Sequence, residues 1–347
     1  MDKATFLSSL DFDSIICLTD KILSSSKNIC SVLHNPIPSA PNSLAILLSK
    51  GVSELVLIFN SLGNLKFIDS EKLKKIEIIR GDINDYNFIE EITKDINIIF
   101  HLAALIAIPY SYNAPSSYFK TNIIGTNNIL EAAKKNKVKK IIHTSTSEVY
   151  GDAQYSRINE NHPICAQSPY SASKIGADIV GESYFNSFNL PVTTARPFNC
   201  YGPRQSLRSI IPSIISQALF NKGRIKVGNT YPKRDFTYVE DTCNALISIC
   251  GKKNNEGKTY NIGSGKSISI DELIKTIGNV LNIKIKLTKD RKRKRIASSE
   301  VDNLLFDNKF IKKDIKWIPK ISLNEGIKLT SKWIINQKEY KTDKFIL

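Results

Sequence analysis

The chain has 347 residues, which is enough for two domains or one large one. Hydrophobic residues make up 41% of it and charged residues 24%, a balance that excludes wholesale disorder, a collagen-like repeat and a disulfide-stapled miniprotein. The 49 Lys and Arg residues against 33 Asp and Glu residues give a formal net charge of +16, but this excess is spread along the chain, so we predict no nucleic-acid partner from it.

Metal-binding, disulfide and membrane signals are absent from the sequence. The six cysteines contain no CxxC pair and the four histidines show no HExxH spacing, so we expect neither a metal site nor a disulfide framework. The longest apolar stretch, residues 98–108, is interrupted by His101 and is shorter than the ~20 residues of a spanning helix. Without a secretory signal at the N-terminus, a cytoplasmic location is the expectation.

The predicted elements alternate between strands and helices from about residue 50 onward. Residues 1–26 match no known pattern, and residues 44–49 are predicted to be helical. Nearly continuous apolar runs, typical of strands buried on both faces, indicate a doubly wound α/β sheet. These runs are residues 55–59, 76–79, 96–100, 140–143 and 192–195.

The predicted helices include residues 118–137, which end in a lysine-rich turn that suits the negative end of the helix dipole. After Arg196 several prolines make the pattern irregular, which indicates a second lobe, and residues 241–250 then return to a helical pattern. Two later helices begin with potential capping boxes, Ser269 with Glu272 and Ser322 with Glu325.

Candidate chemistry follows the strand at residues 140–143. Thr146, Ser147 and Glu148 come directly after it, and ligands bind at strand ends in open α/β sheets. Tyr170 and Lys174 are four residues apart and so share one face of a helix. A nearby ammonium group favours the phenolate and lowers the tyrosine pKa, which predicts an acid–base site.

Together with other motifs in the same order, these residues resemble the extended short-chain dehydrogenase/reductase family, and within it the nucleotide-sugar 4,6-dehydratases and epimerases. The strongest likeness is to dehydratases of legionaminic-acid-type sugar pathways. The likeness extends from about residue 76 to the C-terminus, so coincidence is negligible although each motif alone is weak. The further motifs are GDI (81–83), HLAA (101–104), TNIIGT (121–126), RPFN (196–199), YGP (201–203), RDF (234–236) and NIG (261–263).

The resemblance implies a Rossmann-like doubly wound parallel sheet with a smaller α/β substrate lobe. Residues 27–196, completed by 236–262, would form the NAD-binding domain. Residues 197–235 and 263–340 would form the nucleotide-sugar-binding lobe, and the protein would be a homodimer.

It also implies a set of binding residues. Those expected to bind NAD are Asp82, Ile83, Ala103, Ala104, Asn122, Tyr170 and Lys174. Those expected to bind the nucleotide sugar are Ser147, Asn199, Arg204, Arg234 and Arg295. The three arginines suit this role because a guanidinium group can form paired hydrogen bonds with a diphosphate. His101 and His143 are expected to be packed or hydrogen-bonded.

The catalytic residues implied by the resemblance are Thr146, Glu148, Tyr170 and Lys174. Tyr170 would be the base at the sugar O4, with Thr146 bonded to the same oxygen, and Glu148 would remove the C5 proton. The family's epimerases bring no carboxylate to this position, so Glu148 favours a dehydratase, unless it is a structural carboxylate paired with a lysine. A Ser-Glu pair resembles that of enzymes acting on GDP-mannose.

We therefore predict an NAD-dependent 4,6-dehydratase that converts a GDP- or UDP-linked N-acetylhexosamine into a 4-keto-6-deoxy product. A nucleotide-sugar 4-epimerase and a catalytically silent sugar-nucleotide-binding protein are the alternatives.

One segment departs from the family pattern. Asn35, Pro38 and Pro41 stand where a GxxGxxG turn is expected. Because each proline removes an amide donor and adds a ring where the backbone approaches phosphate, NAD binding and activity are predicted to be impaired. A disrupted gene, lost cofactor binding and an unusual but competent loop all remain open.

Overall fold

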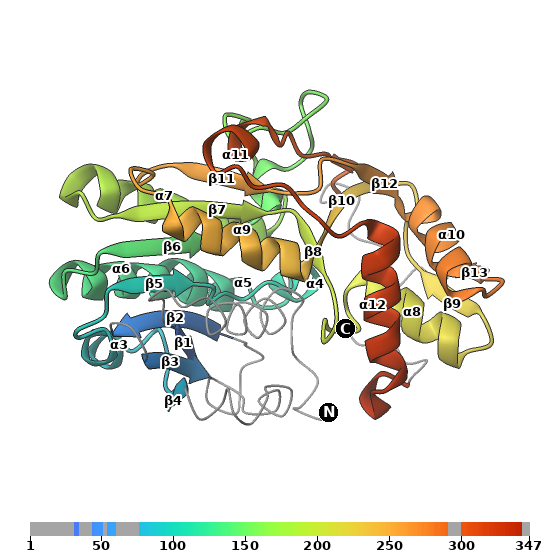
Figure 1. Cartoon of the computed structure of the whole chain (residues 1–347), viewed down its shortest axis with the longest axis horizontal. Coiled ribbons are helices and arrows are strands. Elements are labelled where there is room, and N and C mark those ends of the chain that lie inside the picture. Colours follow the sequence, from blue (N-terminus) through green and yellow to red (C-terminus); the bar gives the residue numbers. More distant parts are fainter. Residues whose placement is uncertain (1–30, 35–43, 51–53, 60–75, 291–299, 342–347) are drawn as a thin grey trace.

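The computed structural model describes residues 31–34, 44–50, 54–59, 76–290 and 300–341. They form a large sheet with helices on its two faces and a smaller lobe beside one end of the sheet (Figure 1). No helix in these ranges is long and apolar enough to cross a membrane.

The large sheet has the order β11-β7-β6-β5-β2-β3-β4, with β1 paired to β2. Its strands are β1 (Ser31–His34), β2 (Leu44–Lys50), β3 (Glu54–Phe59), β4 (Ile76–Arg80), β5 (Ile98–His101), β6 (Lys140–Thr144), β7 (Val192–Pro197) and β11 (Thr259–Ile262). The pairs β3–β4, β5–β6, β6–β7 and β7–β11 are parallel. The predicted α/β fold class with a parallel sheet is confirmed.

The prediction of a helix at residues 44–49 is wrong, because these residues belong to β2. This strand is antiparallel to β1, β3 and β5. A short apolar run has no period that separates a helix from a buried strand, and here the neighbouring strands supply the backbone hydrogen bonds. The predicted strand at residues 96–100 begins two residues later than expected, at Ile98.

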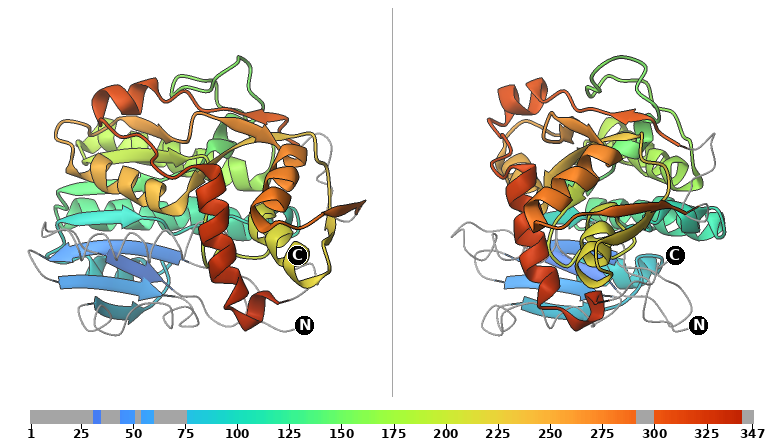
Figure 2. Two further views of the ribbon diagram at one scale, coloured as in Figure 1. Left: turned by 45° about the vertical axis from the view of Figure 1, so that its right-hand side comes forward. Right: turned by 90° about the vertical axis from the view of Figure 1, so that its right-hand side faces the viewer.

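Helices cover both faces of the sheet (Figures 1 and 2). On one face lie α3 (Tyr86–Ile92), α5 (Pro115–Tyr118), a π-helical segment (Phe119–Ile124), α6 (Gly125–Lys135) and α7 (Pro169–Phe188). On the other face lies α9 (Val239–Gly251), which contains the predicted helix 241–250. The helix predicted at residues 118–137 is one continuous helix formed by α5, the π-helical segment and α6, and is called the long helix below.

The smaller lobe contains a four-stranded sheet, a strand pair and three helices. The sheet is built from β8 (Asn199–Tyr201), β10 (Lys233–Tyr238), β12 (Ser267–Ser269) and β14 (Asn303–Leu304). The pair is β9 (Arg224–Val227) with β13 (Lys286–Lys289), and the helices are α8 (Ile210–Phe220), α10 (Ile270–Leu281) and α12 (Leu323–Ile335). The short helix α4 (Ile108–Ser111) follows β5, and α11 (Lys309–Asp314) packs against β11.

The two predicted capping boxes differ in the structure. At the start of α10, Ser269 and Glu272 bond to each other's backbone amides, which confirms the complete box. At the start of α12, Ser322 accepts a bond from the Glu325 amide at 3.2 Å, and the reciprocal bond is not made. Ser322 is therefore a helix cap without a capping box.

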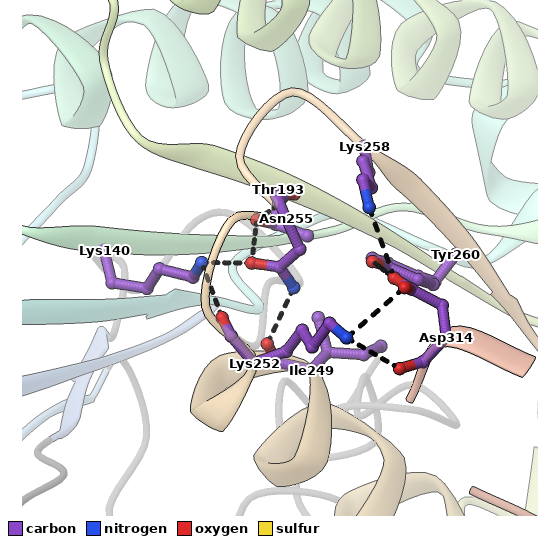
Figure 3. A network of polar contacts seen from close by, with 8 residues as sticks. All are labelled: Lys140, Thr193, Ile249, Lys252, Asn255, Lys258, Tyr260 and Asp314. Carbon is purple, nitrogen blue, oxygen red and sulfur yellow. Dashed lines mark hydrogen bonds and ion pairs between the residues drawn. The ribbon is translucent and has the colours of Figure 1, made fainter. Parts of the chain in front are cut away.

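A polar network anchors the end of the sheet at which its parallel strands begin (Figure 3). The buried Lys140 ammonium donates to the Asn255 side chain and, at 2.6 Å, to Glu256. Asp314 of α11 accepts bonds from Lys252, Lys258 and Tyr260. Lys140 thus ties the start of β6 to the loop between α9 and β11, and Asp314 ties this loop and the start of β11 to α11. Both contacts lie at the end of the sheet opposite the strand ends that carry the candidate chemistry.

Candidate active site

A cavity of about 360 Å³ lies between the strand ends of the large sheet and the smaller lobe. Six of the predicted residues line it: Thr146, Ser147, Glu148, Tyr170, Asn199 and Arg234. The first four come from the large-sheet side and the last two from strands of the small sheet. The cavity therefore joins the two groups of residues that the sequence assigned to catalysis and to substrate binding.

The start of α7 fixes the tyrosine and the lysine. Ser168 caps this helix by accepting a bond from the Ser171 amide at 3.1 Å, and proline follows at the first helical position. Tyr170 and Lys174 are both buried. The Lys174 ammonium donates a 2.7 Å bond to the backbone oxygen of Thr144, which ties α7 to the end of β6.

Glu148 lies on a single 3₁₀ turn, Ser147–Tyr150, directly after β6. The Thr146 hydroxyl caps this turn by accepting a bond from the Glu148 amide at 3.3 Å. Ser147 is buried, whereas Glu148 is half-buried and lines the cavity with Tyr170. A carboxylate and a phenol therefore share one cavity, an arrangement that can remove protons from two positions of one ligand.

Two side chains of the long helix hold the segment that follows β5. Asn122 accepts a bond from the Leu105 amide at 2.7 Å, and its own amide group donates to the Leu105 oxygen and to Ser173. The Tyr118 hydroxyl donates to the Ala107 oxygen at 2.6 Å, and its ring lies edge-on to that of Tyr170, 6.2 Å away. These bonds of Asn122 are made within the protein, and its cofactor contact stays a prediction.

At the lobe end of the cavity, Arg234 is buried and lies 3.4 Å from Glu300, which also accepts a bond from Asn229. Asn199 donates a 3.4 Å bond to the backbone oxygen of Asp235. Glu300 was missed by sequence reasoning because a lone glutamate so far along the chain from its partner carries no local pattern. Only the fold brings the two together.

Arg208 was also missed. It precedes α8 and lines the same cavity, and burial lowers the pKa of its guanidinium to about 10. The family resemblance implied Arg204 in this stretch, and no motif marked Arg208. Arg204 does not line the cavity, and its backbone oxygen accepts a bond from Tyr340. Arg295 lies outside the described residues.

Among the residues expected to bind NAD, those at positions 82, 83, 103 and 104 follow strand ends, whereas the other three, Asn122, Tyr170 and Lys174, lie on helices. Asp82 follows β4, and its Oδ1 accepts bonds from the backbone and side chain of Asn84. Ile83 is fully buried, and Ala103 and Ala104 are buried directly after β5. A carboxylate, two minimal side chains and the Lys174 ammonium at strand ends fit a dinucleotide cofactor. Asn35, Pro38 and Pro41 lie outside the described residues.

The two strand-end histidines are buried side by side, with ring centroids 5.4 Å apart. His143 Nε2 lies 3.0 Å from Asp178, and His101 Nε2 lies 2.8 Å from the Thr126 hydroxyl. Burial lowers the pKa of both imidazoles, so both are neutral at pH 7. The expectation that they are packed and hydrogen-bonded is confirmed. The described ranges contain no cluster of His, Cys, Asp and Glu that could hold a metal.

The chain is similar to a known family and to proteins of known activity. Residues 42–330 match the family described as GDP-mannose 4,6 dehydratase. The chain is 31% identical over 284 residues to a human dTDP-D-glucose 4,6-dehydratase, covering 79% of this chain and 78% of the relative.

Two solved structures are similar as well. A dTDP-glucose 4,6-dehydratase from Streptomyces venezuelae with NAD bound superposes with a TM-score of 0.75 at 25% identity, covering 83% of this chain and 89% of that one. A UDP-N-acetylglucosamine 4-epimerase from Methanobrevibacter ruminantium superposes with a TM-score of 0.73 at 30% identity, covering 81% and 90%.

Proposed function

Because the chain belongs to the GDP-mannose 4,6-dehydratase family of NAD-dependent sugar-nucleotide enzymes, we propose that it dehydrates a GDP- or UDP-linked N-acetylhexosamine. The observation that carries this proposal is the cavity shared by Glu148 and Tyr170. The proposed product is the 4-keto-6-deoxy sugar nucleotide, as in the legionaminic-acid-type dehydratases that the sequence resembles.

Each residue has a distinct task in the proposed reaction. Tyr170 removes the proton of the sugar O4 while Thr146 donates a bond to that oxygen, and the Lys174 ammonium lies one helical turn further along α7. NAD, when bound, would supply the acceptor for the C4 hydride and the donor of the hydride that C6 receives. The C4 ketone acidifies the C5 hydrogen, which Glu148 removes as a proton, and the C6 hydroxyl then leaves.

The net change in the sugar is the loss of one molecule of water. C6 exchanges its hydroxyl for hydride, C5 regains a proton, and the O4 proton completes the water. Asn199 and Arg234 hold the nucleotide diphosphate in this proposal, Ser147 contacts the sugar nucleotide, and Arg208 is a further cation in the cavity wall. The roles of Arg204, which does not line the cavity, and of Arg295, which lies outside the described residues, stay predictions.

Purified protein incubated with NAD and each of the GDP- and UDP-N-acetylhexosamines tests the activity, because a 4-keto product absorbs in alkali. Glu148→Gln is expected to abolish product formation, and Tyr170→Phe to do the same. Glu182→Gln, an exposed glutamate on α7, is the matched control and should leave the rate unchanged. Absence of a 4-keto product from every donor with the wild-type protein would refute the proposal.

A 4-epimerase is the second candidate, favoured by the similarity to the archaeal UDP-N-acetylglucosamine 4-epimerase. The same incubation separates the two, because an epimerase yields a C4-inverted sugar that keeps its 6-hydroxyl. Binding of sugar nucleotide without binding of NAD, measured by calorimetry, would indicate a catalytically silent protein. We further propose that Asn35, Pro38 and Pro41 weaken NAD binding.

A further inference from the structure

A chain of buried polar side chains runs behind the cavity from α7 to the turn that carries Glu148. Asp178 of α7 accepts bonds through Oδ2 from Arg196 of β7, with Nε at 3.0 Å and Nη2 at 2.9 Å. The third guanidinium nitrogen, Nη1, donates a 2.9 Å bond to the hydroxyl of Tyr150. Tyr150 in turn donates to the Asn261 side chain at 2.8 Å.

This network connects the two elements that carry the candidate catalytic residues, α7 and the 3₁₀ turn at residues 147–150. Tyr170, Lys174 and Asp178 follow one another at four-residue spacing and so lie on one face of α7. Tyr150 closes the 3₁₀ turn on which Glu148 lies two residues earlier. Arg196 therefore connects the helix of the phenol with the turn of the carboxylate.

The contacts of this network are buried and directional. Asp178, Arg196 and Tyr150 are all buried. The guanidinium also lies over the Tyr150 ring, 5.0 Å from its centroid. Burial opposes the charge on Asp178, but the bond with His143 and the charge of Arg196 hold the pKa of this carboxyl below its ordinary value. Both charges are thus retained, and planar guanidinium bonds fix direction as well as distance.

Taking the proposed dehydratase activity as given, we propose that Asp178, Arg196 and Tyr150 are positioning residues that align Glu148 with Tyr170 across the sugar. None of the three lines the cavity. Loss of the Tyr150 hydroxyl releases the turn that carries Glu148 and leaves α7 in place, because the bonds between Arg196 and Asp178 remain. Removal of the C5 proton then slows more than oxidation at C4.

Tyr150→Phe tests this proposal because it removes a single oxygen. We expect kcat for the 4-keto product to fall about tenfold, as for loss of a bond to a charged group, with KM unchanged. The isotope effect of C5-deuterated substrate on kcat should rise, and that of C4-deuterated substrate should fall. Tyr184→Phe is the matched control, since its hydroxyl also bonds side chains, Asn127 and Glu131, but lies at the far end of α7.

A uniform loss in kcat with both isotope effects unchanged would indicate a merely structural role and overturn the proposal. Arg196→Lys, which keeps the charge but not the planar fork, should give an intermediate effect between wild type and Arg196→Met. A crystal structure of Tyr150→Phe gives a readout that does not need activity. We expect the 147–150 turn displaced and Tyr170 unmoved, and a superimposable turn would overturn the proposal even if the wild type makes no 4-keto product.

Discussion

Asp235 is a buried carboxyl whose ionisation opposes folding. Burial raises its pKa to about 6, although the amides of Ser264 and Gly265 donate bonds to it. Because this pKa lies above that of the unfolded chain, the folded state binds more protons between about pH 4 and 6, and its stability rises as the pH falls through this window.

Relative to Asp235→Asn, the wild-type free energy of unfolding should therefore increase by about 1 kcal/mol between pH 7 and pH 5. Urea unfolding of both proteins at the two pH values measures this difference. The asparagine variant changes the absolute stability as well, so the readout is the difference between the two proteins in how their free energy of unfolding changes with pH. Equal slopes for the two proteins would contradict the raised pKa.

Arg208 keeps its guanidinium in the cavity wall against the cost of burial, which lowers its pKa. A group held at such a cost in a binding cavity is expected to contact the ligand. Arg208→Met should weaken binding of the preferred sugar nucleotide about tenfold, as for loss of a charge-assisted bond, and calorimetry measures it. The exposed Arg224→Met is the control. Equal affinities of the two variants would exclude a ligand contact.

At the scale of elements, α10 and α12 offer a matched pair of helix starts. Only Glu272 makes the reciprocal bond of the capping box. Ser269→Ala should cost about 1 kcal/mol, the usual value for a lost cap. Both glutamate-to-alanine substitutions change the helix propensity equally. Glu272→Ala should lower the melting temperature more than Glu325→Ala does, because only Glu272→Ala removes a reciprocal bond. An equal change in melting temperature would show that the reciprocal bond contributes nothing.

Asn35, Pro38 and Pro41 are predicted to weaken NAD binding, and substituting them measures how strongly. Replacing all three residues by glycine restores two amide donors and a flexible turn, and we expect the NAD dissociation constant to fall about tenfold. Because β2 and not a helix follows this segment, the gain comes from these amides and not from a helix dipole. Sugar-nucleotide affinity, measured in the same calorimeter, should not change. Unchanged NAD affinity would show that the natural segment binds the cofactor fully.

Local patterns predicted most elements and part of the site. The apolar runs of β3, β4, β6 and β7 and the spacing of Tyr170 and Lys174 are readable because each lies in one short stretch. β2 was mistaken for a helix because its strand pairing is not encoded locally. Arg208, Glu300 and the connection from Asp178 to Tyr150 depend on segments that only the fold brings together.

At the scale of the whole molecule, the expected homodimer has a candidate interface. Phe119 and Ile124 on the long helix and Ile179 on α7 are exposed apolar residues on adjoining helices. We predict that two copies associate through this helix pair and that Ile124→Lys with Ile179→Lys gives a monomer in sedimentation equilibrium. Ile318→Lys, 51% exposed like both of these residues, is the control. A wild-type monomer, or a double variant that stays dimeric, would contradict the prediction.

The cavity takes one wall from the large sheet and the other from the smaller lobe. A molecule seated there touches both and acts as a cross-link between them. Its binding therefore stabilises the folded arrangement of the two parts, and this stabilisation grows with the logarithm of its concentration. The enzyme's resistance to heat and to proteases inside a cell would thus follow the supply of its own substrate.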